Sequence, residues 1–211
     1  MTTIFISGSR EIPFVPDEVR ERIDRILGSD FDIVIGDSER GVDSAVLRYL
    51  ASRAYQNVSV YTVHEKPRTK HVLDTWSVCR ITPSSVVKTD KAGNVRNGRE
   101  IETAKDRAMG AIADYGLVIW QSTYVNRFGN ESASKGSLRN MYQLLSKGKP
   151  VVLYKTAATD LDDICFDCHE LKTLEDLREI ALSEPGVVAR AFVEIEKRDP
   201  LSSPSLFDEA E

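Results

Sequence analysis

The stretch Ile33–Ala51, IVIGDSERGVDSAVLRYLA, contains an apolar run, a polar turn and a helical pattern in immediate succession. The apolar run stops at Gly36, and apolar residues then recur at helical spacing from Ala45 onward. This order is typical of a buried strand that leads into a helix. The turn between them, Asp37 to Asp43, carries a glycine, an arginine and two aspartates, and its position before a helix N-terminus favours an anion. The stretch therefore predicts a strand–turn–helix unit whose turn holds a phosphorylated small molecule.

The composition is that of an ordinary acidic globular protein. The chain has 211 residues and a net charge of −5, with 41% hydrophobic and 29% charged residues. This length fits one α/β domain with additions, and the negative charge argues against a global basic field for nucleic acid. No window approaches the roughly 20 apolar residues of a membrane span. The N-terminus has neither the positively charged start nor the long apolar core of a signal peptide. We therefore expect a cytoplasmic protein with no membrane partner.

Strand and helix patterns alternate over most of the chain. Strands are predicted at 3–7, 31–35, 58–63, 117–120 and 151–154, and helices at 16–27, 44–54, 101–112 and 137–146. The alternation predicts an α/β fold, a Rossmann-like doubly wound and mostly parallel sheet with helices on both faces.

The predicted domain spans residues 1–155 and is interrupted by a long polar segment. This segment, 64–100, is interpreted as an insertion or lid after the third strand, with a hairpin near 90–94. Residues 156–197 are predicted to form a helical extension, and 198–211 a mobile acidic tail.

Four polar turns are predicted at the carboxyl edge of the sheet, where ligands of open α/β sheets bind. Glycines there let backbone approach a ligand, arginine and lysine pair with phosphate, and an aspartate can cap a helix or accept from a ribose hydroxyl. Each turn alone has an ordinary structural explanation, whereas their convergence predicts one ligand-binding site. The candidate binding residues are Gly8, Ser9, Arg10, Gly36, Asp37, Arg40, Gly41, Asp43, Lys105, Arg107, Ser134, Lys135, Gly136 and Ser137.

The order of these turns resembles the SLOG superfamily of Rossmann-like proteins, most closely its YpsA-related branch. That branch carries a G-S-R turn after the first strand, a G-x-A-R-G-x-D turn after the second and an R-N-x-x-M helix. A turn ending in G-T and a G-x-P-V strand follow. The corresponding segments here are Gly8-Ser9-Arg10, Gly36 to Asp43, Lys105 to Met109, Ser134 to Ser137 and Gly148 to Val151.

The resemblance implies that the protein binds a nucleotide or a nucleotide-derived ligand of ADP-ribose type, as a sensor or processing protein, and forms a homodimer. The wider superfamily includes phosphoribohydrolases and DprA-like proteins that bind single-stranded DNA. Two alternatives therefore stay open. One is an N-glycosidase acting on nucleoside phosphates, and the other is a single-stranded DNA-binding protein, for which the locally basic insertion is the candidate contact.

The chain departs from the pattern of the hydrolase branch where catalysis would take place. Asn140 stands about where that branch has a glutamate, and asparagine cannot act as a base at neutral pH. Glycosidic hydrolysis needs a carboxylate near an oxocarbenium-like centre. The candidate catalytic residues are therefore Glu131 and Asp106, and whether the protein is an enzyme is left open.

The cysteines offer a weaker signal. Cys165, Cys168 and His169 form a C-x-x-C-H string, which could hold zinc if Cys79 or His71 supplied a fourth ligand. Partly buried cysteines on a connecting segment explain the string better. We predict no metal site and no cofactor.

Overall fold

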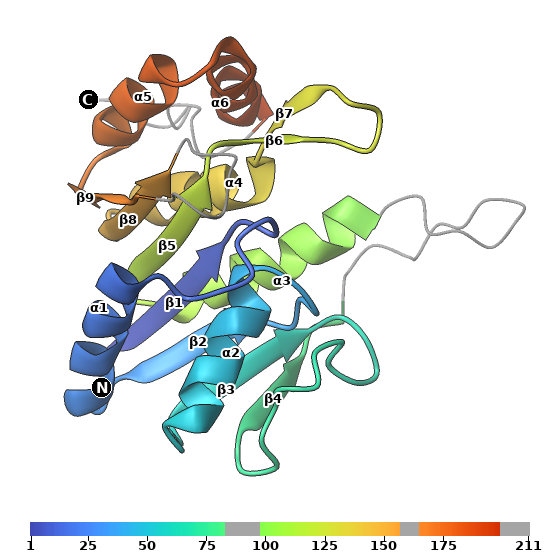
Figure 1. The fold of residues 1–211 in the computed structure, drawn as a ribbon, viewed down its shortest axis with the longest axis vertical. Coiled ribbons are helices and arrows are strands. Elements are labelled where there is room, and N and C mark those ends of the chain that lie inside the picture. Colours follow the sequence, from blue (N-terminus) through green and yellow to red (C-terminus); the bar gives the residue numbers. More distant parts are fainter. Residues whose placement is uncertain (83–97, 157–164, 199–211) are drawn as a thin grey trace, which may run out of the picture.

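The computed structural model describes residues 1–82, 98–156 and 165–198, and it confirms the α/β fold (Figure 1). A seven-stranded sheet in the order β4-β3-β2-β1-β5-β8-β9 forms the centre of the described chain. Every neighbouring pair is parallel except β8 and β9, which run antiparallel. The strands are β1 (Thr3–Gly8), β2 (Asp32–Gly36), β3 (Val58–Thr62), β4 (Ser77–Arg80), β5 (Tyr115–Gln121), β8 (Val151–Thr156) and β9 (Asp167–Leu171).

Helices cover both faces of this sheet, as a Rossmann-like arrangement requires. Helices α1 (Asp17–Gly28) and α2 (Val42–Ser52) lie on one face, and α3 (Gly98–Ile112) and α4 (Lys135–Leu145) on the other. Helices α5 (Leu174–Ser183) and α6 (Gly186–Arg198) pack beyond α4.

Strand β1 shows how the two faces are separated. Ile4 and Ile6 pack in one core cluster with residues of α1 and α2, whereas Phe5 packs in a second cluster with Met109 of α3 and Met141 of α4. Successive side chains of a strand point to opposite faces, so Ser7 faces α3 and α4 together with Phe5. Ser7, near the end of β1, therefore lies on the same side of the sheet as the pocket described below.

The strands and helices predicted over 1–155 are present, with bounds that differ by a few residues. Three features were not predicted: strand β4, strand β9, and a hairpin formed by β6 (Thr123–Val125) and β7 (Glu131–Ala133). The first two are edge strands with largely exposed side chains, so their sequences lack the apolar run of a buried strand. The hairpin predicted near 90–94 and most of the predicted tail lie outside the described residues.

The topology excludes a zinc site that combines Cys79 with Cys168. Cys79 lies on β4 and Cys168 on β9, at opposite edges of the sheet. Six strand spacings of about 4.8 Å separate these edges. Within the described ranges, none of the helices has the combination of length and apolar character that would let it cross a membrane.

The turns after β1 and β2 touch each other directly. The Val42 backbone N–H donates to the Ser9 carbonyl oxygen at 3.1 Å. Gly41 has φ of 76°, and a Cβ there would lie 2.4 Å from the Arg10 Cα. The position therefore needs glycine both for its backbone conformation and for the space.

We predict that Gly41→Ala destabilises the fold more than Gly129→Ala, although both glycines have φ of 76°. A Cβ at Gly129 meets nothing within 4 Å, so that variant should lose only about 1 kcal/mol from backbone strain. Gly41→Ala adds the steric clash and should lose about 2 kcal/mol more. Urea unfolding of both variants measures the difference, and equal losses would show that the two turns are not packed together.

Candidate functional site

A pocket of about 810 Å³ opens at the carboxyl edge of the sheet. Its walls come from the turns after β1 and β2, the middle of α3, the hairpin β6–β7, the start of α4 and one side of α6. Most of the residues predicted from the sequence line this single pocket. They are Gly8, Arg10, Gly36, Arg40, Asp43, Lys105, Asp106, Glu131, Ser134, Lys135, Gly136 and Ser137.

Four predicted residues do not line the pocket. Arg107 is exposed and is not part of the pocket wall. Ser9, Asp37 and Gly41 are buried behind the wall, where they hold its parts together. Three of these residues support the pocket wall and Arg107 has a solvated position, while their contact with a ligand stays a prediction.

Ser9 joins three elements at the end of β1. Its hydroxyl accepts a hydrogen bond from the Gln121 N–H at 3.0 Å, and its Oγ lies 2.9 Å from the Oγ of Ser134. Its carbonyl oxygen accepts from Val42, the first residue of α2. The first residue of α2 and the N-cap residue of α4 therefore both contact Ser9 through polar atoms.

Helices α2 and α4 both begin at the pocket, and neither N-terminus has a side-chain cap. Their N-cap residues, Gly41 and Ser134, make no capping hydrogen bond to the helix backbone. The first N–H groups of a helix lack partners within the helix and carry a partial positive charge. Two such termini joined through Ser9 at one pocket make a site that favours an anion.

Cationic side chains surround these helix termini. Arg10 and Arg40 line the pocket and are exposed, and neither forms an ion pair with another described residue. Lys135, at the start of α4, pairs with Glu194 of α6 at 2.8 Å. Arg139 and Arg190 also line the pocket. The outer part of the pocket is therefore positively charged, which suits a phosphate group.

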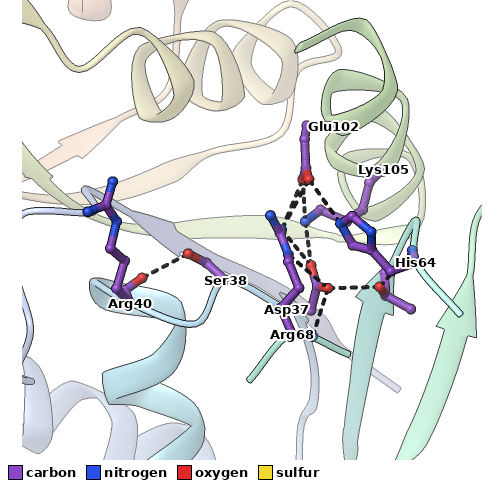
Figure 2. A network of polar contacts seen from close by, with 8 residues as sticks. Asp37, Ser38, Arg40, His64, Arg68, Glu102 and Lys105 are labelled. Atoms are coloured by element: carbon purple, nitrogen blue, oxygen red, sulfur yellow. Dashed lines mark hydrogen bonds and ion pairs between the residues drawn. The ribbon is translucent and has the colours of Figure 1, made fainter. Parts of the chain in front are cut away.

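A buried ion network lies at the inner end of the pocket (Figure 2). Asp37, at the end of β2, is fully buried and accepts hydrogen bonds from Lys105 Nζ at 2.8 Å, Arg68 at 2.9 Å and Thr62 Oγ1 at 2.8 Å. Glu102 lies 2.8 Å from Lys105 and 3.1 Å from Arg68. Burial alone would raise the pKa of Asp37, but these hydrogen bonds outweigh it and hold the pKa well below its ordinary value.

This network corrects the prediction that Asp37 orients a ribose. Its carboxylate has no exposed surface and is already bound by two cations and a hydroxyl. Lys105, which is only 3% exposed, is likewise held inward by Asp37 and Glu102. Both residues act as supports of the pocket wall, and Asp43 is the remaining aspartate of the second turn that can meet a ligand.

The sequence interpretation did not identify Arg68 and Glu102, although a signal for a buried cation was present. Lys105 occurs four residues after Ile101 and four before Met109, and all three are buried on one stripe of α3. A lysine in the apolar stripe of a helix is rarely buried without a partner. The pattern alone could have predicted a paired, structural lysine in place of a solvated one.

We predict that Asp37→Asn destabilises the fold by about 3–5 kcal/mol, because it leaves Lys105 and Arg68 without their shared carboxylate in a buried place. Asp24→Asn is the matched control, since Asp24 forms a 2.6 Å ion pair with Arg53 at the surface. That variant should lose less than about 1 kcal/mol. Chemical denaturation measures both, and similar losses would show that the Asp37 network does not hold the fold together.

Asp43 and Asp106 are the two half-buried carboxylates that line the pocket and form no ion pair with another described residue. Burial raises the pKa of Asp43 to about 6, against the opposing effect of Lys105. Burial raises the pKa of Asp106 to about 7, and the nearby charges of Asp43 and Glu102 add to the effect. Both groups therefore exchange protons near neutral pH.

Gly36 makes room for the Asp43 carboxylate. A Cβ on Gly36 would lie 2.6 Å from Asp43 Oδ2 and 3.5 Å from Lys105 Nζ. Gly36 follows Val34, which packs with Met109 of α3, so this Cβ position is on the α3 face of the sheet. The Asp43 carboxylate thus reaches from the start of α2 across the end of β2 toward α3.

We predict that Asp106 makes the fold less stable as the pH rises from about 4 to about 7. The folded chain holds this proton more tightly than the unfolded chain, for which the ordinary pKa is 3.8, so the advantage is lost across that window. Asp106→Asn should remove the loss and be more stable than the wild type at pH 8 by about 2–4 kcal/mol. Urea unfolding of both chains at pH 5 and pH 8 measures this, and parallel pH profiles would contradict it.

Comparisons with known proteins found no similarity from which a family could be assigned. No protein-family model matches the chain, and the searches of curated proteins and of solved structures found no significant match.

Proposed function

We propose that the protein binds a nucleotide, or a nucleotide derivative of ADP-ribose type, in the pocket at the carboxyl edge of its sheet. The observation that carries the proposal is the meeting of the N-termini of α2 and α4 at one pocket, where neither has a side-chain cap and the Val42 N–H of α2 is bonded to the Ser9 carbonyl oxygen. A phosphate between them accepts hydrogen bonds from backbone N–H groups and lies in the field of both helices. Arg10 and Arg40 then neutralise its charge. The resemblance to the SLOG superfamily supports the same ligand class.

The rest of the pocket suits the other parts of a nucleotide. The carboxylates of Asp43, which also accepts from the Ser38 backbone N–H, and of Asp106 are acceptors for the hydroxyl groups of a ribose. Tyr124 of β6 lines the same pocket and is half-buried, so its ring offers a surface for a base. A volume of about 810 Å³ lies within the range of small-molecule sites.

The carboxylate pair favours one second candidate, an N-glycosidase that acts on nucleoside phosphates. A carboxylic acid with a pKa of about 7, as in Asp106, is suited to donate a proton to a departing base. An ionised Asp43 beside it would stabilise the positive charge that develops on the sugar. In this function Glu131, which is exposed on β7, has no described partner that would prepare it for catalysis.

We predict that AMP and ADP-ribose bind to the protein at least about tenfold more tightly than adenosine, and that Arg40→Ala removes most of this difference. Arg20→Ala is the control, because Arg20 pairs with Asp17 on the outer surface of α1. Isothermal titration calorimetry measures the affinities. Equal binding of AMP and adenosine, or equal behaviour of the two arginine variants, would contradict a phosphate site between α2 and α4.

The same samples distinguish a binding protein from an enzyme. Chromatography after incubation of the wild type with a panel of nucleoside monophosphates detects any released base. Release that disappears in Asp106→Asn supports the hydrolase, and tight binding without release supports the sensor or processing protein.

A further inference from the structure

The inner end of the pocket gathers four carboxylates around two ion-paired cations, with Arg10 acting on Asp43 and Arg139 on Asp106 from nearby. Asp37 and Glu102 are matched by Lys105 and Arg68, with four contacts of 2.8–3.1 Å. Asp43 and Asp106 approach the same cluster, yet neither enters an ion pair within the part of the chain that the structure describes. Asp43 accepts a hydrogen bond from the Ser38 backbone N–H, but two carboxylates without an ion-pair partner are unfavourable in a partly buried place. A further cation at these two carboxylates would balance the charge that the guanidinium groups of Arg10 and Arg139 only reduce.

Unpartnered oxygen atoms accompany this pair of carboxylates. Ser7 Oγ and Asn140 Oδ1 are buried, line the same pocket and have no hydrogen-bond partner among the described atoms. Both residues are only 5% exposed. Ser7 lies on the face of β1 that is covered by α3 and α4, which carry Asp106 and Asn140 respectively. Buried polar atoms without a protein partner are sites for a water molecule, an ion or a ligand atom.

These groups have the chemistry that a hard divalent cation prefers. The carboxylates, the amide oxygen and the hydroxyl are all oxygen donors, which suit Mg²⁺ and Mn²⁺ better than softer metals. No group of three or more His, Cys, Asp or Glu side chains in the described residues is arranged to hold a metal. A cation here would therefore be held by two carboxylates and complete its coordination with water and with the phosphate of a ligand, as Mg²⁺ commonly does.

We propose that Asp43 and Asp106 bind one divalent cation of the Mg²⁺ or Mn²⁺ type, which links the inner carboxylates of the pocket to the phosphate of its ligand. Ser7 and Asn140 hold water molecules of its coordination shell. The part that concerns the phosphate rests on the proposed nucleotide-binding function, whereas the binding of the cation itself does not. The cation supplies the positive charge that Lys105 and Arg68, already paired with Asp37 and Glu102, do not provide.

The first test is the binding of Mn²⁺ to the full chain after removal of metals with EDTA, in the absence of any nucleotide. Electron paramagnetic resonance at pH 7.5 follows the loss of the free Mn²⁺ signal. We expect one bound ion, at least tenfold weaker binding for Asp43→Asn or Asp106→Asn, and none for the double variant. Asp74→Asn, which removes an exposed carboxylate outside the pocket, should bind as the wild type does, and Mg²⁺ should compete.

The same measurement can overturn the proposal. A wild-type chain that binds no Mn²⁺, or a double variant that binds it as tightly as the wild type, shows that these carboxylates do not form a cation site. The substitutions keep the shape of the side chain and remove unpaired negative charge. Thermal unfolding without metal is recorded for each variant, and a melting temperature at or above that of the wild type shows that lost binding is not lost folding.

The second test separates the cation from the nucleotide. ADP is titrated into the wild type and into the Asp43→Asn/Asp106→Asn variant, once with excess EDTA and once with excess MgCl₂. We expect Mg²⁺ to tighten ADP binding at least tenfold in the wild type and to have no such effect in the variant. ADP that binds equally well in both conditions, to a chain that takes up no Mn²⁺, overturns the cation site and leaves the proposed function intact. Mn²⁺ uptake without ADP binding leaves the cation site intact and overturns the proposed function.

Discussion

The carboxylate of Asp37 is the interaction on which the pocket depends. It lies at the end of β2 and binds a lysine from α3, an arginine from the segment after β3 and a threonine from the end of β3. Two of these partners lie 31 and 68 residues away in sequence. Because a buried carboxylate is costly without cations, and Lys105 is costly without carboxylates, the elements hold each other in one arrangement. The position of α3 over the sheet, and hence of Asp106, follows from this arrangement.

Ser9 has the corresponding role at the outer end of the pocket. One hydroxyl and one carbonyl oxygen connect the end of β1 with the end of β5, the start of α2 and the start of α4. Gly8 lets these parts approach, since a Cβ there would lie 2.3 Å from the Ile119 carbonyl oxygen. Two helix N-termini would repel each other through their partial positive charges. An anionic ligand between the two N-termini would reduce this electrostatic repulsion.

The sequence predicted the central fold well because its strands are buried on both faces and its helices are amphipathic. Gly8, Gly36 and Arg40 were assigned to one edge by the same logic, which needs only the alternation of strands and helices. The sequence pattern could not show whether Asp37 contacts a ligand or is a buried structural residue. That difference depends on its ion pair with Arg68, and the segment that carries Arg68 has no periodic pattern. Strands β4 and β9 were missed since edge strands with exposed side chains carry no apolar signal. Ser7 was not a candidate, and Asn140 was noted only for the missing glutamate, until their unpartnered atoms were found in the pocket lining.

The two parts of the pocket differ in the sign of their charge, and this difference limits which ligands fit. Arg10, Arg40 and the helix termini make its outer part positive, while Asp43 and Asp106 leave its inner part negative. A simple anion satisfies only the first part, and a simple cation only the second. The proposed ligand, a phosphorylated sugar with a divalent ion, would satisfy both, with its phosphate at the helices and its hydroxyl groups and metal at the carboxylates. Gly36 is essential to this division, since any larger residue would displace the Asp43 carboxylate from the α3 side of the sheet, where it faces Lys105 and Asp106.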